Sequence, residues 1–190
     1  SNEQFKVINK VDIAATYNPY IGNESVGKLQ KDIDNNKNVK ASTKVNIQLA
    51  TFESNNEIVD SAQLITVNKD DYKNYITLTD NDDKGINLPV DAAVVSEKLA
   101  YLHKLNVGDS FNVIVNNKEY ILTVGKINKN YFGHTIYINK DYYESVFQKQ
   151  YKDNTFLVQT TGGKETVESV VSNLNNNSDI VNISDNSKIQ

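Results

Sequence analysis

Several residue types are missing from this chain of 190 residues, and each absence excludes a class of chemistry. Cysteine is absent, which excludes thiol nucleophiles, thiolate metal sites and disulfides, and leaves the redox compartment open. Methionine and tryptophan are absent, and all 20 basic residues are lysines. Without arginine, the chain lacks the bidentate donor that proteins favour for phosphates and guanine edges, and its net charge is -4. Nucleic-acid binding is therefore not expected.

Long apolar runs are also missing. No stretch approaches the roughly 20 apolar residues of a membrane-spanning helix, and the start of the chain has no signal-peptide pattern. The chain begins with Ser1-Asn2 rather than methionine, so we expect a soluble segment cut from a longer protein. With 38% hydrophobic residues, a chain of this length can bury a core without disulfides or structural metals.

The two ends of the chain carry the same pattern of elements. Apolar residues recur at helical spacing in two segments: Val26, Leu29 and Ile33, and Val167, Val170, Val171 and Leu174. Strands are predicted on both sides of each helix, at Phe5–Ala15, Val39–Phe52, Phe156–Val158 and Ile180–Ile183. An amphipathic helix must cover a sheet, so the two βαβ-like halves predict one two-layer α/β subdomain built from residues 1–52 and 153–190. Ser25 is predicted as the N-cap of the first helix.

Residues 53–152 form the insertion between these halves and are predicted to be mainly β with short helices. A helix is expected after an N-cap at Ser96, with Leu99, Leu102 and Leu105 on one face, ending at Gly108. Two alternating segments on either side of Asn116-Asn117 give the clearest hairpin signal in the chain. The fold class is therefore α+β, with a split α/β subdomain and an inserted β-rich one.

The inserted region also resembles a known family. The resemblance rests on the helical stretch Val94–Ala100, the Gly108-Asp109 turn within Leu105–Phe111, the hairpin ending at Val124-Gly125, and Thr135–Ile138. Together these segments resemble the extracytoplasmic domain of FtsX/MacB-like ABC transporter permeases. That resemblance implies a porter-like α/β subdomain interrupted by a β-rich one, in agreement with the split layout of the chain.

The resemblance also implies a function. It predicts a non-enzymatic domain outside the cell membrane that couples cytoplasmic ATP hydrolysis to export or to an extracytoplasmic partner. The implied partners are a cytoplasmic ATPase subunit, a second permease copy in a dimer, and a peptide, lipoprotein or other cell-envelope component. No Gly-rich phosphate loop occurs in the sequence, and no cofactor, metal or catalytic residue is expected. The alternative is a secreted or cell-wall-associated module that binds proteins or peptides.

Three groups of residues were weighed as sites. His103 and His134 are the only histidines, and each is expected to be an ordinary, partly exposed side chain. Asp80, Asp82, Gly85 and Asp91 have the spacing of positions 1, 3, 6 and 12 of a calcium loop. Lys84 occupies a ligand position of that loop and Asp91 is shorter than the usual glutamate, so an acidic surface loop is favoured.

The third group is aromatic. Tyr142, Tyr143 and Tyr151 belong to an unusually large set of 11 tyrosines. They form either an exposed strip suited to partner contact or part of a β-rich core, and the core is favoured.

Overall fold

The computed structural model describes residues 10–129 and 133–186, which form two compact units. Unit 1 contains residues 10–45, 74–76 and 153–186, and unit 2 contains 46–73, 77–129 and 133–152. The β-rich unit is thus inserted between segments of the α/β unit, and the predicted fold class is confirmed. Residues 5–9 of the strand predicted at Phe5–Ala15 lie outside the described residues.

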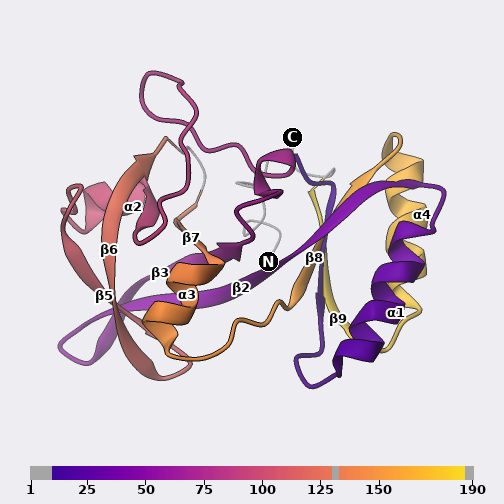
Figure 1. Cartoon of the computed structure of the whole chain (residues 1–190), viewed down its shortest axis with the longest axis horizontal. Helices are drawn as coiled ribbons and strands as arrows, with labels where there is room; N and C mark the ends of the chain where they lie inside the picture. The colour runs from indigo at the N-terminus through magenta and orange to yellow at the C-terminus, as the bar shows by residue number, and fades with distance from the viewer. Residues whose placement is uncertain (1–9, 130–132, 187–190) are drawn as a thin grey trace. The chain divides into compact units, whose positions relative to one another are not determined.

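Unit 1 is a two-layer α/β sandwich (Figure 1). Its elements are β1 (Ile13–Tyr17), α1 (Asn23–Asp34), the first part of β2 (Val39–Ser54), β8 (Thr155–Thr160), α4 (Lys164–Asn175) and β9 (Ile180–Asp185). The strand order is β2-β8-β1-β9, and all neighbouring pairs are antiparallel. Each βαβ half therefore receives a strand of the other half between its own two strands.

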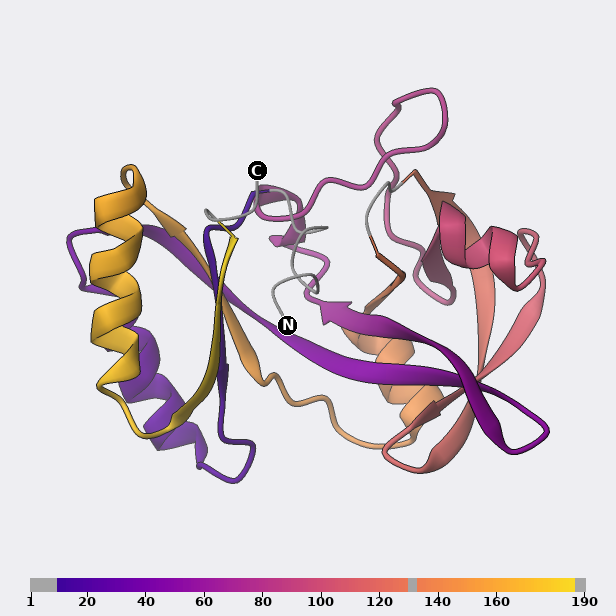
Figure 2. The same ribbon diagram turned by 180° about the vertical axis from the view of Figure 1, so that it is seen from behind.

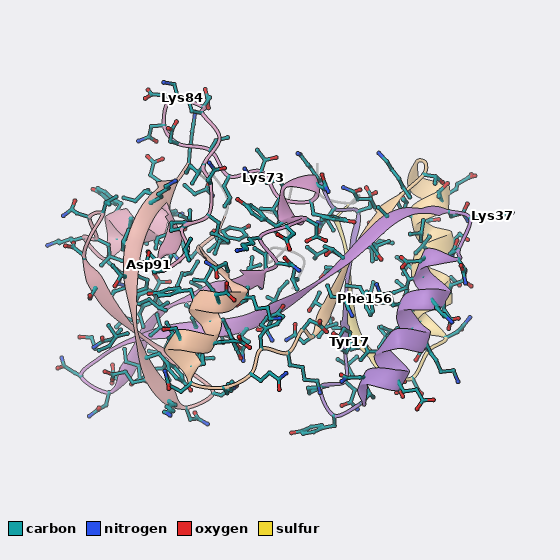
Figure 3. The ribbon with its side chains drawn as sticks, viewed as in Figure 1. Tyr17, Lys37, Lys73, Lys84, Asp91 and Phe156 are labelled. Atoms are coloured by element: carbon teal, nitrogen blue, oxygen red, sulfur yellow. The ribbon has the colours of Figure 1, made fainter. Side chains whose placement is uncertain are left out.

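The helices of unit 1 lie side by side on one face of this sheet in both views (Figures 1 and 2). Their buried residues were predicted from the sequence: Val26, Leu29 and Ile33 on α1, and Val167, Val170 and Leu174 on α4. Val171, predicted on the same face of α4, is only partly buried. Beneath them the rings of Tyr17 and Phe156 pack with centroids 5.3 Å apart (Figure 3). The prediction that Ser25 caps α1 is wrong, because the helix begins at Asn23 and Gly22 holds the extended N-cap position.

The first and last strands of unit 1 are neighbours. Ile13 on β1 lies opposite Asp185 on β9. Just beyond them, the backbone N–H of Asn186 donates to the carbonyl of Asp12 at 2.8 Å, and its side-chain amide donates to the carbonyl of Val11 at 3.0 Å. The described chain therefore begins and ends at the same end of two neighbouring strands.

Unit 2 is a small, closed β-structure. Its strands are the second part of β2, then β3 (Glu57–Val67), β4 (Ala93–Ser96), β5 (Ser110–Val115), β6 (Lys118–Asn128) and β7 (Thr135–Asn139). The order is β3-β7-β4-β6-β5-β2, and β2 also pairs with β3, so the strands form a ring. A ring leaves fewer free strand edges than an open sheet, which suits a β-rich domain of this size.

The core of unit 2 lies inside this ring, and two helices complete it. Helix α2 (Glu97–Leu102) contributes Leu99 and Ala100, and helix α3 (Lys140–Phe147) contributes three aromatic residues. Asn139 caps α3 with its side chain, which accepts from the N–H of Tyr142 at 2.9 Å. The predicted β5–β6 hairpin is confirmed, and Asn116 and Asn117 take positive φ angles of 51° and 66° at its turn.

The end of α2 differs from the prediction. The helix stops at Leu102 rather than near Gly108, because Lys104 takes a positive φ of 53°. Gly108, at φ 95°, lies in the turn before β5, where its N–H donates to the carbonyl of Val124. Ser96 does occupy the N-cap position, but its hydroxyl makes no cap; it accepts a tertiary bond from the N–H of Thr135 at 3.1 Å.

Candidate functional site

The two histidines lie on opposite oxygens of one carboxylate. His103 Nε2 is 3.0 Å from Oδ2 of Asp60, and His134 Nδ1 is 3.0 Å from Oδ1. All three side chains are partly buried: His103 and Asp60 are each 20% exposed, and His134 is 17% exposed. The sequence-based view of two unrelated histidines is therefore incomplete. No local pattern indicated this meeting, because the three residues come from separate segments of the chain.

The surroundings of Asp60 favour its ionised form. Partial burial raises the pKa of this carboxyl, and it is the largest single influence. The hydrogen bond from His103, the backbone N–H of Ser61 and the interaction with His134 together outweigh burial and lower the pKa below its ordinary value. The N–H of Ser61 donates to Oδ1 at 2.8 Å. Asp60 is thus an anion held by three donors, the arrangement that stabilises a charged carboxylate.

The ring of His103 is also fixed by packing. It stacks on Phe52 with centroids 4.0 Å apart and an interplanar angle of 19°. Phe52 lies on β2 directly opposite Asp60 on β3. The β2–β3 pair therefore supplies both the carboxylate that binds His103 and the phenyl ring on which His103 stacks. His134 precedes β7, and Tyr131 and Phe132, shortly before it in the sequence, lie outside the described residues.

The acidic loop is organised by its own backbone. Oδ1 of Asp80 accepts from the N–H groups of Asp82 and Lys84, at 2.9 and 3.0 Å, and Asp83 pairs with Lys129 at 3.0 Å. Figure 3 places Lys84 at the tip of the projecting loop and Asp91 well away from it. The residues with calcium-loop spacing therefore do not surround one point. Across the described parts of the chain, no group of three or more His, Asp or Glu side chains is arranged to hold a metal ion.

The three tyrosines belong to the core of unit 2, as favoured from the sequence. Tyr142 and Tyr143 are buried, and Tyr151 packs half-buried against them. The hydroxyl of Tyr142 accepts from the N–H of Thr123 at 2.9 Å, while Tyr143 and Tyr151 meet edge to face at 5.4 Å. These side chains therefore do not form an exposed strip.

Exposed apolar groups gather instead around α2 and the loop after it. A hollow of about 630 Å³ is lined here by Asn81, Glu97, Ala100, Tyr101, Leu102, Lys104, Leu105, Asn106 and Ile127. Two of these lining side chains are exposed and apolar: Tyr101 is 81% exposed and Leu102 is 51% exposed. We call this surface the α2 hollow. Leu102 was predicted to share one helix face with Leu99, but Leu99 is buried while Leu102 is exposed at the end of α2.

The fold resembles that of several solved structures. The periplasmic region of MacB from Actinobacillus actinomycetemcomitans has 13% identity and a TM-score of 0.48, with 98% of this chain and 94% of that chain covered. The extracellular domain of the noncanonic ABC-type transporter YknZ from Gram-positive bacteria has 16% identity and a TM-score of 0.47, with 90% and 99% covered.

A putative lipoprotein from Bacillus anthracis is a more distant match, with 11% identity, a TM-score of 0.40, and 90% of this chain and 96% of that chain covered. No family model matches the sequence, and no curated protein matches it. None of the helices in the described ranges has the length and apolar character needed to cross a membrane.

Proposed function

We propose that this chain is the extracytoplasmic domain of an ABC transporter permease. The observation that carries the proposal is the junction of the first and last strands of unit 1, where Asn186 bonds to the carbonyls of Asp12 and Val11. A domain that loops out between two membrane-spanning segments must return to the bilayer that it left. Paired first and last strands meet that requirement. The split order of the chain and its sequence resemblance to FtsX/MacB-like permeases agree with the same function.

In this proposal the domain transmits motion. ATP hydrolysis by a cytoplasmic ATPase subunit moves the membrane segments, and unit 1 receives that movement through its joined strands. The chain then passes into unit 2 within strand β2, whose residues pair with β8 in unit 1 and with β3 in unit 2. A hydrogen-bonded strand transmits displacement better than a flexible linker does. The movement drives export or acts on a partner outside the membrane.

The domain has no catalytic role in this proposal. Its partners are the ATPase subunit, a second permease copy, and a peptide, lipoprotein or cell-envelope component that contacts unit 2. Purified domain should therefore neither bind nor hydrolyse ATP.

The location can be tested with a single cysteine, since this chain contains none. Lys84→Cys places a thiol at the exposed tip of the loop in unit 2 (Figure 3). The full-length protein carrying this change is treated in intact cells with a membrane-impermeant maleimide. We expect labelling without lysis, and the parent protein without the substitution provides the background. Labelling that appears only after lysis would reject the proposal.

Membrane attachment separates the proposal from the alternative of a secreted or wall-associated module. The labelled protein should remain with the membrane pellet in high salt and be released by detergent. Release by high salt or by cell-wall digestion alone would favour the binding module instead. Recovery of the cytoplasmic ATPase subunit with the detergent-solubilised protein would support the permease role directly.

A further inference from the structure

Three polar side chains lie on the face of strands β2 and β3 that lines the core of unit 2. Asn46 on β2 is directly opposite Thr66 on β3, and Gln48 is opposite Leu64. Leu64 belongs to the hydrophobic core, and alternate residues of a strand share one face of the sheet. Asn46, Gln48 and Thr66 therefore share the core-facing side of the strand pair. Asn46 is 6% exposed, Thr66 is completely buried, and Gln48 is half-buried.

Each of these side chains brings a buried oxygen that makes no hydrogen bond to any residue that the structure describes. The oxygens are Oδ1 of Asn46, Oε1 of Gln48 and Oγ1 of Thr66. The orientation of the Asn46 amide is fixed by its Nδ2, which donates to the carbonyl of Lys152 at 2.9 Å. Its Oδ1 is thus an acceptor in the core of unit 2. Buried polar oxygens in folded proteins are nearly always bonded to protein or to ordered water.

The hydrogen-bonding capacity of the three oxygens matches one water molecule. The amide oxygens of Asn46 and Gln48 can only accept, whereas the hydroxyl of Thr66 can donate. Water supplies two donors and an acceptor, and buried waters typically make about three hydrogen bonds. Directly opposite side chains have Cβ atoms about 5 Å apart, a separation that a bridging water can span. A metal cation matches less well, because all three side chains are neutral and an unpaired buried charge is costly.

We propose that Asn46, Gln48 and Thr66 form a binding site for a buried water molecule in unit 2. The water donates to the two amide oxygens and accepts from the Thr66 hydroxyl. Asn46 is the first residue of unit 2 and Lys152 is the last, so the bond between them connects this site to both ends of the unit. This inference does not depend on the permease role and holds for any protein that carries this domain.

The test is the sign of the effect of Thr66→Val on urea unfolding of the whole chain. Valine keeps the shape of threonine but removes the hydroxyl. With water bound, the substitution removes a hydrogen bond, and we expect the unfolding equilibrium constant to rise by about three- to tenfold. Without water, it replaces an unpartnered buried hydroxyl with a methyl group and should lower the constant. A lowered or unchanged constant would therefore overturn the proposal.

Thr123→Val is the matched control, because it makes the same change at a partly exposed position on strand β6 of unit 2. It should change the unfolding constant by less than about twofold. Gln48→Met removes a second bond to the same water. Its effect and that of Thr66→Val should combine to less than their product, because either change alone releases the water. Independent, multiplicative effects would contradict a shared water.

A crystal structure of the parent chain decides the matter if Thr66→Val does not fold. We expect one ordered water within about 3.2 Å of both Oδ1 of Asn46 and Oγ1 of Thr66. A direct hydrogen bond between these two side chains would overturn the proposal. A metal ion at the same place, identified by its anomalous scattering, would also overturn it.

Discussion

The N–H of Asn186 donates to the carbonyl of Asp12 across 2.8 Å, and the Asn186 side chain reaches the carbonyl of Val11 at 3.0 Å. These two bonds join the segment before β1 to the segment after β9. They hold the first and last described segments of unit 1 together. A displacement applied to either segment is therefore applied to neighbouring strands of one sheet.

The Asn186 side chain should contribute measurably to stability. Asn186→Ala removes the bond to Val11 but leaves the backbone bond to Asp12, so we expect a loss of about 1 kcal/mol in the free energy of unfolding. Asn182→Ala changes an exposed side chain on β9 and should have a much smaller effect. Urea denaturation of the two variants measures the difference. Equal effects would mean that the Val11 bond adds nothing to the junction.

Two glycines should respond to alanine in opposite ways. A Cβ on Gly125 would lie 2.7 Å from Cβ of Ala92 and 2.9 Å from Cγ of Pro89. Gly125→Ala should therefore destabilise unit 2 by about 1–3 kcal/mol through overpacking. Gly27 lies on the exposed side of α1, and its Cβ would meet no atom within 4 Å. Gly27→Ala should stabilise the chain by about 0.5–1 kcal/mol, because glycine weakens a helix interior.

Thermal unfolding measures both changes, and each variant is the control for the other. Destabilisation by Gly27→Ala would indicate that α1 is not an ordinary exposed helix at this position. A neutral Gly125→Ala would indicate that the segment around Pro89 and Ala92 can move away at little cost.

The acid limb of the stability curve should depend on Asp60. Its pKa is lowered in the folded state by the donors around it, despite the opposing effect of burial. The stabilisation that this provides is fully present above the unfolded-state pKa of about 3.9 and is lost as pH falls through the lower folded value. Between pH 4.5 and 2.5 the parent chain should therefore lose more stability than Asp60→Asn. Parallel acid limbs in thermal melts of the two proteins would contradict this expectation.

Transmission between the units should require more than strand β2: the return passage between them should also have to be stiff. Lys152 and Asp153 lie on either side of one passage between the units. A short Gly-Ser insertion between them keeps the bond from Asn46 to the carbonyl of Lys152 and the bond from the Tyr17 hydroxyl to Asp153. The isolated domain should remain folded, because doubling a flexible loop costs only about 0.6 kcal/mol. Transport or partner-dependent activity of the intact permease should be lost.

The matched control places the same insertion between Asn116 and Asn117, at the β5–β6 turn within unit 2. This variant should keep the activity of the intact protein, because the added slack does not lie between the units. Full activity of the Lys152-Asp153 insertion at normal membrane abundance would reject the transmission mechanism.

Much of unit 1 could be predicted from the sequence because its signals are local. The spacing of Val26, Leu29 and Ile33 defines a buried helix face within about two turns, and the second helix repeats it. A helix with one apolar face must cover a sheet, so the split α/β layout followed from the two ends of the chain. The Asn116-Asn117 hairpin was equally local, because a two-residue turn and its flanking strands are adjacent in sequence.

The tertiary structure alone decided the features that join distant segments. Asp60, His103 and His134 carry no shared local pattern, and they meet because β3, the end of α2 and the start of β7 converge. Ser96 has the sequence position of a helix cap, yet its hydroxyl accepts from Thr135, 39 residues away. Periodicity shows which face of an element is buried, but not which other segment will cover it. That choice depends on the pairing of strands far apart in the chain, so the α2 hollow and the contact of Asp60 with the two histidines appear only once the ring of unit 2 has closed.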